Sequence, residues 1–122
     1  MEKTALEMTQ DIVKILDSRK GSDIEAIRVE EISSLCEYFV LCTGTSVTQV
    51  KALADEVEFR MKNDFDIMPR RTEGYQSGNW IVVDYGSVIV HVMFTEMRQF
   101  YNLEHLWADG EKIDLSGIVQ EN

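Results

Sequence analysis

The sequence is poor in residues that interrupt or cross-link a chain: its 122 residues include one proline, seven glycines and two cysteines. No internal repeat, low-complexity segment or proline-rich stretch marks a linker. The length and a hydrophobic content of 44% suit one domain with one core. We therefore predict a single domain over residues 1–108 and an acidic C-terminal tail over residues 109–122.

Long hydrophobic runs are also missing. No apolar stretch approaches the roughly 20 residues that a membrane-spanning helix needs. The segment Met1–Gln10 mixes charged and apolar side chains and does not resemble a signal peptide. We expect a soluble cytoplasmic protein that makes no membrane contact.

The two cysteines, Cys36 and Cys42, occur in an apolar stretch without the paired spacing of a zinc site. We interpret both as buried thiols in a reducing compartment. A disulfide is the less favoured alternative, because six residues along one strand span roughly 20 Å. Half of a zinc site is another, and we predict neither a metal nor a cofactor.

Positive charge is scarce, with 12 Lys and Arg against 22 Asp and Glu and a net charge of −10. This balance argues against unaided recognition of nucleic acid, which requires a cationic surface. A basic protein would be the more suitable macromolecular partner. Alternatively, the acidic surface serves only solubility.

Apolar periodicity and turn residues predict three helices and five strands. Gly86-Ser87 separates the last two strands and indicates a hairpin. The order predicts an α/β fold: a single domain with a mixed sheet of about five strands packed with helices. The expected helices are Thr4–Lys20, Val47–Asn63 and a stretch from about Thr95 to Gly110, and the expected strands are Ile24–Val29, Tyr38–Cys42, Ile67–Thr72, Trp80–Tyr85 and Val88–Phe94.

The turn Gly44-Thr45-Ser46 lies between a strand and a helix, where backbone amides can hold an anion. It lacks the lysine of a P-loop, and Ser46 with Gln49 fits a helix-capping box, which is the favoured interpretation. The alternative is a nucleotide-binding enzyme of nucleotidyltransferase type. Two-metal catalysis needs neighbouring carboxylates, however, and the following strands offer Asp84 alone.

His91 and Asp84 are a further candidate acid–base pair, but no exposed serine or cysteine nucleophile accompanies them. A single histidine in an apolar strand is more often a hydrogen-bonded core or edge residue. His105 has the same interpretation. We therefore predict no catalytic residue.

Aromatic and acidic residues are dense after residue 72, and both tryptophans lie there. Interfaces concentrate Trp and Tyr, and flanking carboxylates favour a basic partner. The alternative, that the aromatics fill the core, is about equally favoured for the two tryptophans. The predicted partner-binding residues are Glu73, Trp80, Asp84, Tyr101, Glu104 and Trp107.

Several segments, in this order and spacing, closely resemble the bacterial ribosome silencing factor (RsfS, Iojap-like) family. The similarity extends from the first helix to Trp107. The segments are Tyr38-Phe39-Val40, Cys42-Thr43-Gly44-Thr45-Ser46, Glu73-Gly74, Trp80-Ile81-Val82-Val83-Asp84, Val88-Ile89-Val90-His91-Val92, Arg98, Tyr101, Leu103-Glu104 and Leu106-Trp107.

The resemblance implies a nucleotidyltransferase-like fold without the catalytic carboxylates, and a protein that is not an enzyme. It also implies a translational repressor that binds the large ribosomal subunit through ribosomal protein L-fourteen and sterically blocks joining of the small subunit. A homodimer in the free state is typical of the family. Two positions depart from its usual pattern: Glu37 precedes the Tyr-Phe pair and Ser87 follows the hairpin glycine, where the family usually has Asp.

Overall fold

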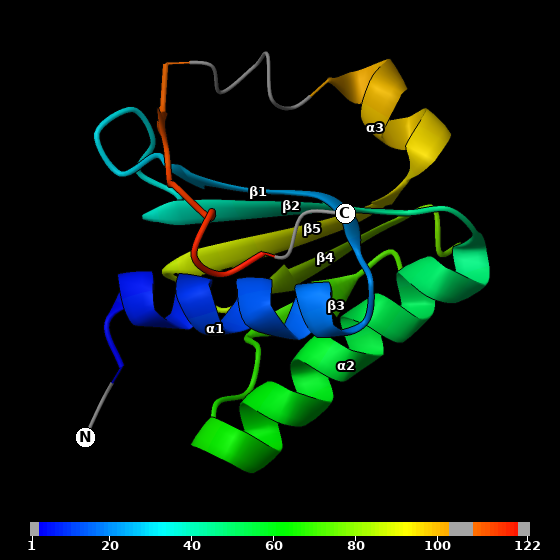
Figure 1. The fold of residues 1–122 in the computed structure, drawn as a ribbon, viewed down its shortest axis with the longest axis horizontal. Coiled ribbons are helices and arrows are strands. Elements are labelled where there is room, and N and C mark those ends of the chain that lie inside the picture. Colours follow the sequence, from blue (N-terminus) through cyan, green and yellow to red (C-terminus); the bar gives the residue numbers. More distant parts are fainter. Residues whose placement is uncertain (1–2, 103–108, 120–122) are drawn as a thin grey trace.

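The structure is a computed structural model that describes residues 3–102 and 109–119. It forms a six-stranded mixed sheet with helices on both faces (Figure 1). This confirms the predicted α/β class and adds a sixth strand. The elements are α1 (Ala5–Ser18), β1 (Ser22–Arg28), β2 (Tyr38–Gly44), α2 (Val47–Phe65), β3 (Arg71–Glu73), β4 (Trp80–Asp84), β5 (Val88–Phe94), α3 (Thr95–Tyr101) and β6 (Glu111–Lys112).

The strands are ordered β3-β4-β5-β2-β1-β6. β2 and β5 pair in parallel and the other neighbours pair antiparallel. Every residue of β2 is buried, as expected for a central strand that is apolar over most of its length. The predicted hairpin is confirmed: Tyr85 N–H donates to the Val88 carbonyl at 2.9 Å, and Gly86 adopts a positive φ of 88° in the turn.

Helices α1 and α2 cover one face of the sheet (Figure 1). A capping box starts α1, in which the Thr4 hydroxyl accepts from the Glu7 amide and the Glu7 carboxylate accepts from the Thr4 amide. The apolar faces of α1 and α2 pack against strand residues such as Val40 and Val83 in the larger core cluster. No described helix is long and apolar enough to cross a membrane.

A smaller cluster lies on the opposite face, built around Phe39, Leu41 and Met93. Trp80 and Met97 pack against it, the second from α3. Since α3 has only seven residues, it covers this face less fully than α1 and α2 cover the other (Figure 1). Among the described residues, Val82 and Ile89 on this face are partly exposed, whereas Val83 and Val90 on the face under α1 and α2 are fully buried.

The strand predicted over Ile67–Thr72 is wrong in its first part, since β3 comprises only Arg71–Glu73. Asp66 adopts a left-handed conformation at the C-terminus of α2, and the Ile67 amide donates to the Met61 carbonyl at 3.0 Å. These bonds satisfy the last turn of the helix. The residues after Asp66 therefore close α2 before the chain reaches the edge of the sheet.

The last helix is shorter than predicted. It ends at Tyr101, because Asn102 adopts a left-handed φ of 49° and its amide donates to the Arg98 carbonyl at 2.9 Å. The prediction of one continuous helix to Gly110 is therefore wrong at Asn102. Residues 103–108 lie outside the described part of the chain.

The segment after residue 108 carries the unexpected strand. In β6, Lys112 pairs with Ile27 of β1, and the Ile113 amide donates to the Ala26 carbonyl at 2.8 Å. Four apolar side chains that follow pack against the larger core cluster: Ile113, Leu115, Ile118 and Val119. The described part of this acidic segment thus forms an edge strand of the sheet and covers part of the larger core cluster.

Candidate docking surface

The register of β4 and β5 places Trp80 beside His91 on the sheet face opposite α1 and α2. Trp80 pairs with Met93, and Val82 pairs with His91. Because side chains alternate along a strand, Trp80 and Val82 share a face, and residues paired across strands share it too. Trp80 and His91 are therefore diagonal neighbours on the less covered face.

The indole Nε1–H of Trp80 donates a hydrogen bond to His91 Nδ1 at 3.0 Å. The Phe39 ring meets the imidazole edge-on from β2, with centroids 5.1 Å apart. Burial lowers the pKa of His91 to about 4, so the imidazole is neutral at pH 7. With Nδ1 accepting, the proton resides on Nε2, which is buried and has no hydrogen-bond partner among the described residues. The interpretation of His91 as a hydrogen-bonded strand residue agrees with this geometry.

The end of α3 extends this aromatic group towards solvent. Tyr101 packs on Trp80 with ring centroids 4.9 Å apart, and Phe100 meets Tyr101 edge-on at 5.1 Å. Phe100 is 80% exposed and Tyr101 is 48% exposed. We call Trp80, Phe100 and Tyr101 the aromatic surface. Adjacent exposed aromatic rings of this kind are characteristic of protein interfaces.

Phe100 is absent from the predicted partner-binding residues. It lies three residues after Met97, which is a helical spacing. In the structure Met97 packs on the smaller cluster, whereas Phe100 is almost fully exposed. With only seven residues in α3, periodicity was too short to separate the two faces.

Two predicted acidic residues, Glu73 and Asp84, lie on the same sheet face but differ in exposure. Glu73 is exposed on β3 and pairs in register with Val82. Asp84 is buried: one carboxylate oxygen accepts from the Gly86 amide at 2.7 Å, and the other lies 3.3 Å from Arg71 Nε. Glu73 is therefore the more accessible negative charge, whereas Asp84 stabilises the hairpin turn. The structure does not place Asp84 as an acid–base partner of His91, since its oxygens are held by Arg71 and Gly86.

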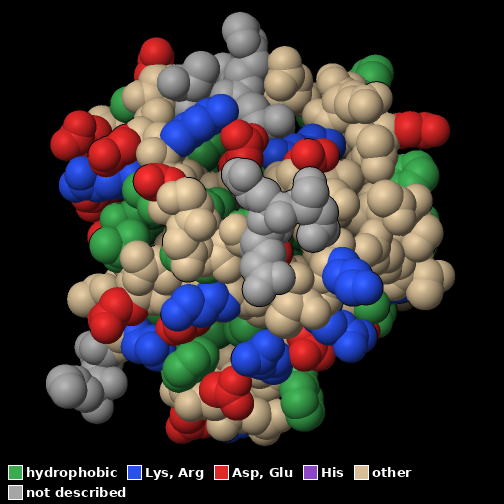
Figure 2. Space-filling model, viewed as in Figure 1, with side chains coloured by type: hydrophobic (Ala, Val, Ile, Leu, Met, Phe, Trp, Pro, Cys, Tyr) green, Lys and Arg blue, Asp and Glu red, His purple; other side chains and the backbone are tan. Residues whose placement is uncertain are grey.

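Of the six predicted contact residues, the structure thus places Glu73, Trp80, Asp84 and Tyr101 on one face of the sheet. Glu104 and Trp107 lie outside the described residues, as does His105. In the view of Figure 2, which looks onto α1, lysine and arginine side chains are interspersed with aspartate and glutamate.

The turn considered as an anion site is occupied by a side chain of the protein itself. Gln49 Oε1 accepts from the Thr45 amide at 2.6 Å and from the Thr45 hydroxyl at 3.0 Å. The Ser46 hydroxyl accepts from the Gln49 amide at 3.0 Å, which confirms Ser46 as the N-cap. The predicted capping box is only half formed, because Gln49 bonds to Thr45 and not to the Ser46 amide. The amide and hydroxyl of Thr45 are therefore already bonded within the protein.

Both cysteines are free thiols. Burial raises the pKa of Cys36 to about 11 and that of Cys42 to about 12, so both free thiols are protonated at pH 7. They are buried, as predicted. Within residues 3–102 and 109–119, no three His, Cys, Asp or Glu side chains are grouped to hold a metal ion.

Comparison with known proteins agrees with this architecture. A model of the family described as "Ribosomal silencing factor during starvation" (RsfS) matches residues 2–122. Ribosomal silencing factor RsfS of Halalkalibacterium halodurans is 34% identical over 113 residues, which are 93% of this chain and 96% of that protein. A crystal structure of a protein from Chromobacterium violaceum has a TM-score of 0.84 at 34% identity, covering 93% of each chain.

A eukaryotic relative is also similar. The mouse protein named "Mitochondrial assembly of ribosomal large subunit protein 1" is 32% identical over 102 residues. The match covers 80% of this chain and 43% of that protein.

Proposed function

We propose that this chain, which belongs to the RsfS family of ribosomal silencing factors, represses translation by binding the large ribosomal subunit through the aromatic surface. Family membership assigns it to ribosome-associated silencing of translation. The proposal adds that the bound protein sterically blocks joining of the small subunit. It acts as a binding protein in the cytoplasm, and catalysis has no part in this function.

The observation that carries the proposal is the row of adjacent rings formed by Phe100, Tyr101 and Trp80 on the less covered sheet face. Exposing Phe100 to water is unfavourable unless a partner covers it, and aromatic anchors dominate the binding energy of interfaces. The other sheet face is filled by α1 and α2. We therefore infer that the partner contacts the end of α3 and the strands beside it.

We propose ribosomal protein L-fourteen as the partner on the large subunit, as the family resemblance implies. Two observations support a basic partner: the net charge of −10 and the exposed Glu73 on the same sheet face. The name of the mouse relative refers to the large subunit, in agreement with this choice. In the free state we propose a homodimer.

The occupied Gly44-Thr45-Ser46 turn and the protonated thiols support a function without catalysis. The amide and hydroxyl of Thr45 are bonded to Gln49. Neither cysteine supplies a thiolate at pH 7. The first observation disfavours the nucleotide-binding alternative, and the second disfavours catalysis by a cysteine nucleophile.

Sedimentation with separated ribosomal subunits tests the proposal. We expect the protein to pellet with large subunits and not with small subunits. Adding the protein before mixing the two subunits should then reduce the fraction of assembled ribosomes in a sucrose gradient. Equal recovery with both subunits, or with neither, would contradict the proposal.

A further inference from the structure

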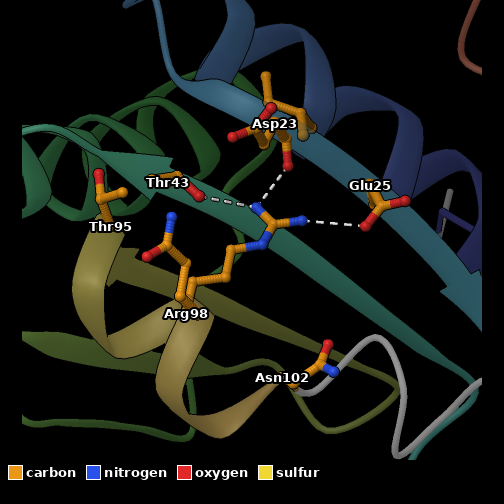
Figure 3. A pocket seen from close by; sticks show the side chains of 8 residues that line it. Asp23, Glu25, Thr43, Thr95, Arg98 and Asn102 are labelled. Atoms are coloured by element: carbon orange, nitrogen blue, oxygen red, sulfur yellow. Dashed lines mark hydrogen bonds and ion pairs between the residues drawn. The ribbon is translucent and has the colours of Figure 1, made fainter.

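Arg98 is a buried cation on the inner side of α3, with an exposed fraction of 7%. Its Nη1 donates to the Thr43 hydroxyl of β2 at 2.9 Å and also to the Asp23 carbonyl of β1. Its Nη2 lies 3.0 Å from Glu25 Oε2. Figure 3 shows the guanidinium reaching from α3 across the ends of both strands. One side chain thus joins three elements.

The backbone of β1 is shaped to meet this guanidinium. The β1–β2 register shifts between Ser22 and Glu25, and Asp23 has a positive φ of 47° within the irregularity. A positive φ is unfavourable for a residue other than glycine and persists only where surrounding contacts hold it. Here the Asp23 carbonyl accepts the hydrogen bond from Arg98.

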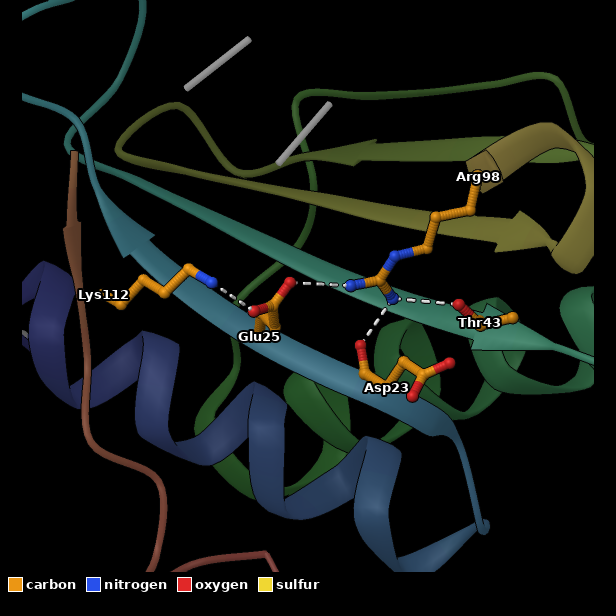
Figure 4. Close-up of polar contacts among 5 residues, drawn as sticks. All are labelled: Asp23, Glu25, Thr43, Arg98 and Lys112. Carbon is orange, nitrogen blue, oxygen red and sulfur yellow. Dashed lines mark hydrogen bonds and ion pairs between the residues drawn. The ribbon is translucent and has the colours of Figure 1, made fainter. Parts of the chain in front are cut away.

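Glu25 extends the connection to the other end of the chain. Its second carboxylate oxygen lies 2.9 Å from Lys112 Nζ on β6. Figure 4 shows Glu25 between the two cations, Arg98 on one side and Lys112 on the other. The contacts therefore run from α3 through β1 to β6.

α3 has seven residues, and isolated helices of that length are unstable in water. Phe94 at its N-cap makes no side-chain capping bond. The placement of α3 must therefore come from tertiary contacts. Burying a charge is unfavourable unless it is paired and hydrogen-bonded, so this guanidinium favours one position of the helix.

We propose that Arg98 is the positioning residue of the aromatic surface. It fixes α3 over the ends of β1 and β2 and so places Tyr101, one helical turn later, against Trp80. Glu25 and Lys112 support the guanidinium from β1 and β6. The consequence for binding rests on the proposed function, whereas the effect on the position of Tyr101 does not.

The first test reads the position of Tyr101 directly in the free, full-length protein. The indole N–H signal of Trp80, assigned by its loss in Trp80→Phe, senses the ring current of Tyr101 in a ¹H–¹⁵N spectrum. We expect Arg98→Met, which keeps most of the aliphatic stem, to shift this signal, and Arg98→Lys to shift it less. Arg28→Met is the matched control, because Arg28 is partly exposed and pairs with Glu30 and Glu111.

A folded Arg98→Met with the Trp80 signal unchanged would overturn the proposal. If Arg98→Met does not fold, Glu25→Gln replaces it, because that change keeps the side-chain volume and removes the negative charge that pairs with the guanidinium. It should shift the Trp80 signal in the same direction. An unchanged signal in Glu25→Gln would then overturn the proposal.

The second test uses large-subunit affinity. We expect Arg98→Met and Tyr101→Ala each to weaken binding about tenfold, and the double variant to stay within about twofold of the weaker single variant. A purely structural role predicts multiplied effects, near a hundredfold, and that result would overturn the proposal. If the wild-type protein does not bind large subunits, the proposed function fails, while the Trp80 signal still tests the positioning role.

Discussion

Trp80 and His91 form one unit on adjacent strands, in which the indole N–H donates to His91 Nδ1 at 3.0 Å. The bond fixes the neutral tautomer of the imidazole and one orientation of the indole. Tyr101 packs on this indole, whose orientation the hydrogen bond holds. The strand pair thus supplies a rigid base for the more exposed rings at the end of α3.

The first prediction concerns pH. Burial lowers the pKa of His91 from 6.5 to about 4, so between these pH values the unfolded chain binds more protons than the folded one. The free energy of unfolding should therefore fall as pH drops from about 6.5 to about 4, by up to roughly 3 kcal/mol from this residue. Urea unfolding of wild type and His91→Gln at pH 7, 5.5 and 4.5 measures the contribution.

The difference between the two proteins isolates His91 from the carboxylates, which titrate in both. We expect the wild-type advantage over His91→Gln to shrink as pH falls. A constant difference across this range would show that His91 has an ordinary pKa in the folded protein.

The second prediction concerns charge at the docking face. Glu73→Lys should weaken large-subunit binding about fivefold or more and reduce its dependence on salt, because it places a cation opposite a basic partner. Asp64→Lys changes the charge by the same two units on α2, where Asp64 forms an exposed pair with Arg60. Affinity measured at 50 and 200 mM salt should separate the two variants.

Equal losses for Glu73→Lys and Asp64→Lys would indicate that only net charge matters. The proposed homodimer gives a further control through light scattering. If Glu73→Lys dissociates the dimer and leaves ribosome binding unchanged, the Glu73 region serves self-association instead.

The third prediction explains Gly44 by packing. A Cβ at this position would lie 2.7 Å from Val50 Cγ2 and 3.0 Å from the Val50 amide nitrogen, in the first turn of α2. Gly44→Ala should therefore lower the free energy of unfolding by roughly 1–3 kcal/mol. Gly117→Ala is the matched control, since its Cβ would meet nothing within 4 Å. Similar stabilities of the two variants in urea would refute the packing explanation.

The fourth prediction concerns nucleotides. Calorimetric titration with magnesium and a nucleoside triphosphate should give no saturable heat, because Gln49 occupies the Thr45 donors. Ser46→Ala should lose about 1 kcal/mol of stability through the missing cap and nothing else. Tight nucleotide binding that Ser46→Ala abolishes, in a variant that remains folded, would favour the enzymatic alternative.

The sequence predicts the parts of this fold that rest on long apolar patterns. The run Tyr38–Cys42 and the hairpin around Gly86 are found where expected. Two features escaped prediction for physical reasons. β6 is the charged pair Glu111–Lys112, which has no strand pattern, and the end of α3 depends on the backbone of Asn102. β6 is decided by its tertiary pairing with β1, and the end of α3 is decided by a local backbone conformation; periodicity predicts neither.

The candidate site was likewise predictable in part. Aromatic enrichment indicated the region of Trp80 and Tyr101, and the structure brings these two rings together. It could not indicate that Asp84 is held by Arg71 and Gly86, or that Phe100 is exposed. Those distinctions depend on which side of a strand or helix faces the core.

Comparison of two exposed phenylalanines tests the central claim most directly. Phe100 belongs to the aromatic surface and is 80% exposed, whereas Phe59 is 64% exposed on α2. Neither truncation should cost much stability, because neither ring is buried. We expect Phe100→Ala to weaken large-subunit binding about tenfold or more and Phe59→Ala to leave it within about twofold of wild type. Loss of binding in Phe59→Ala, with Phe100→Ala unaffected, would contradict docking through the aromatic surface.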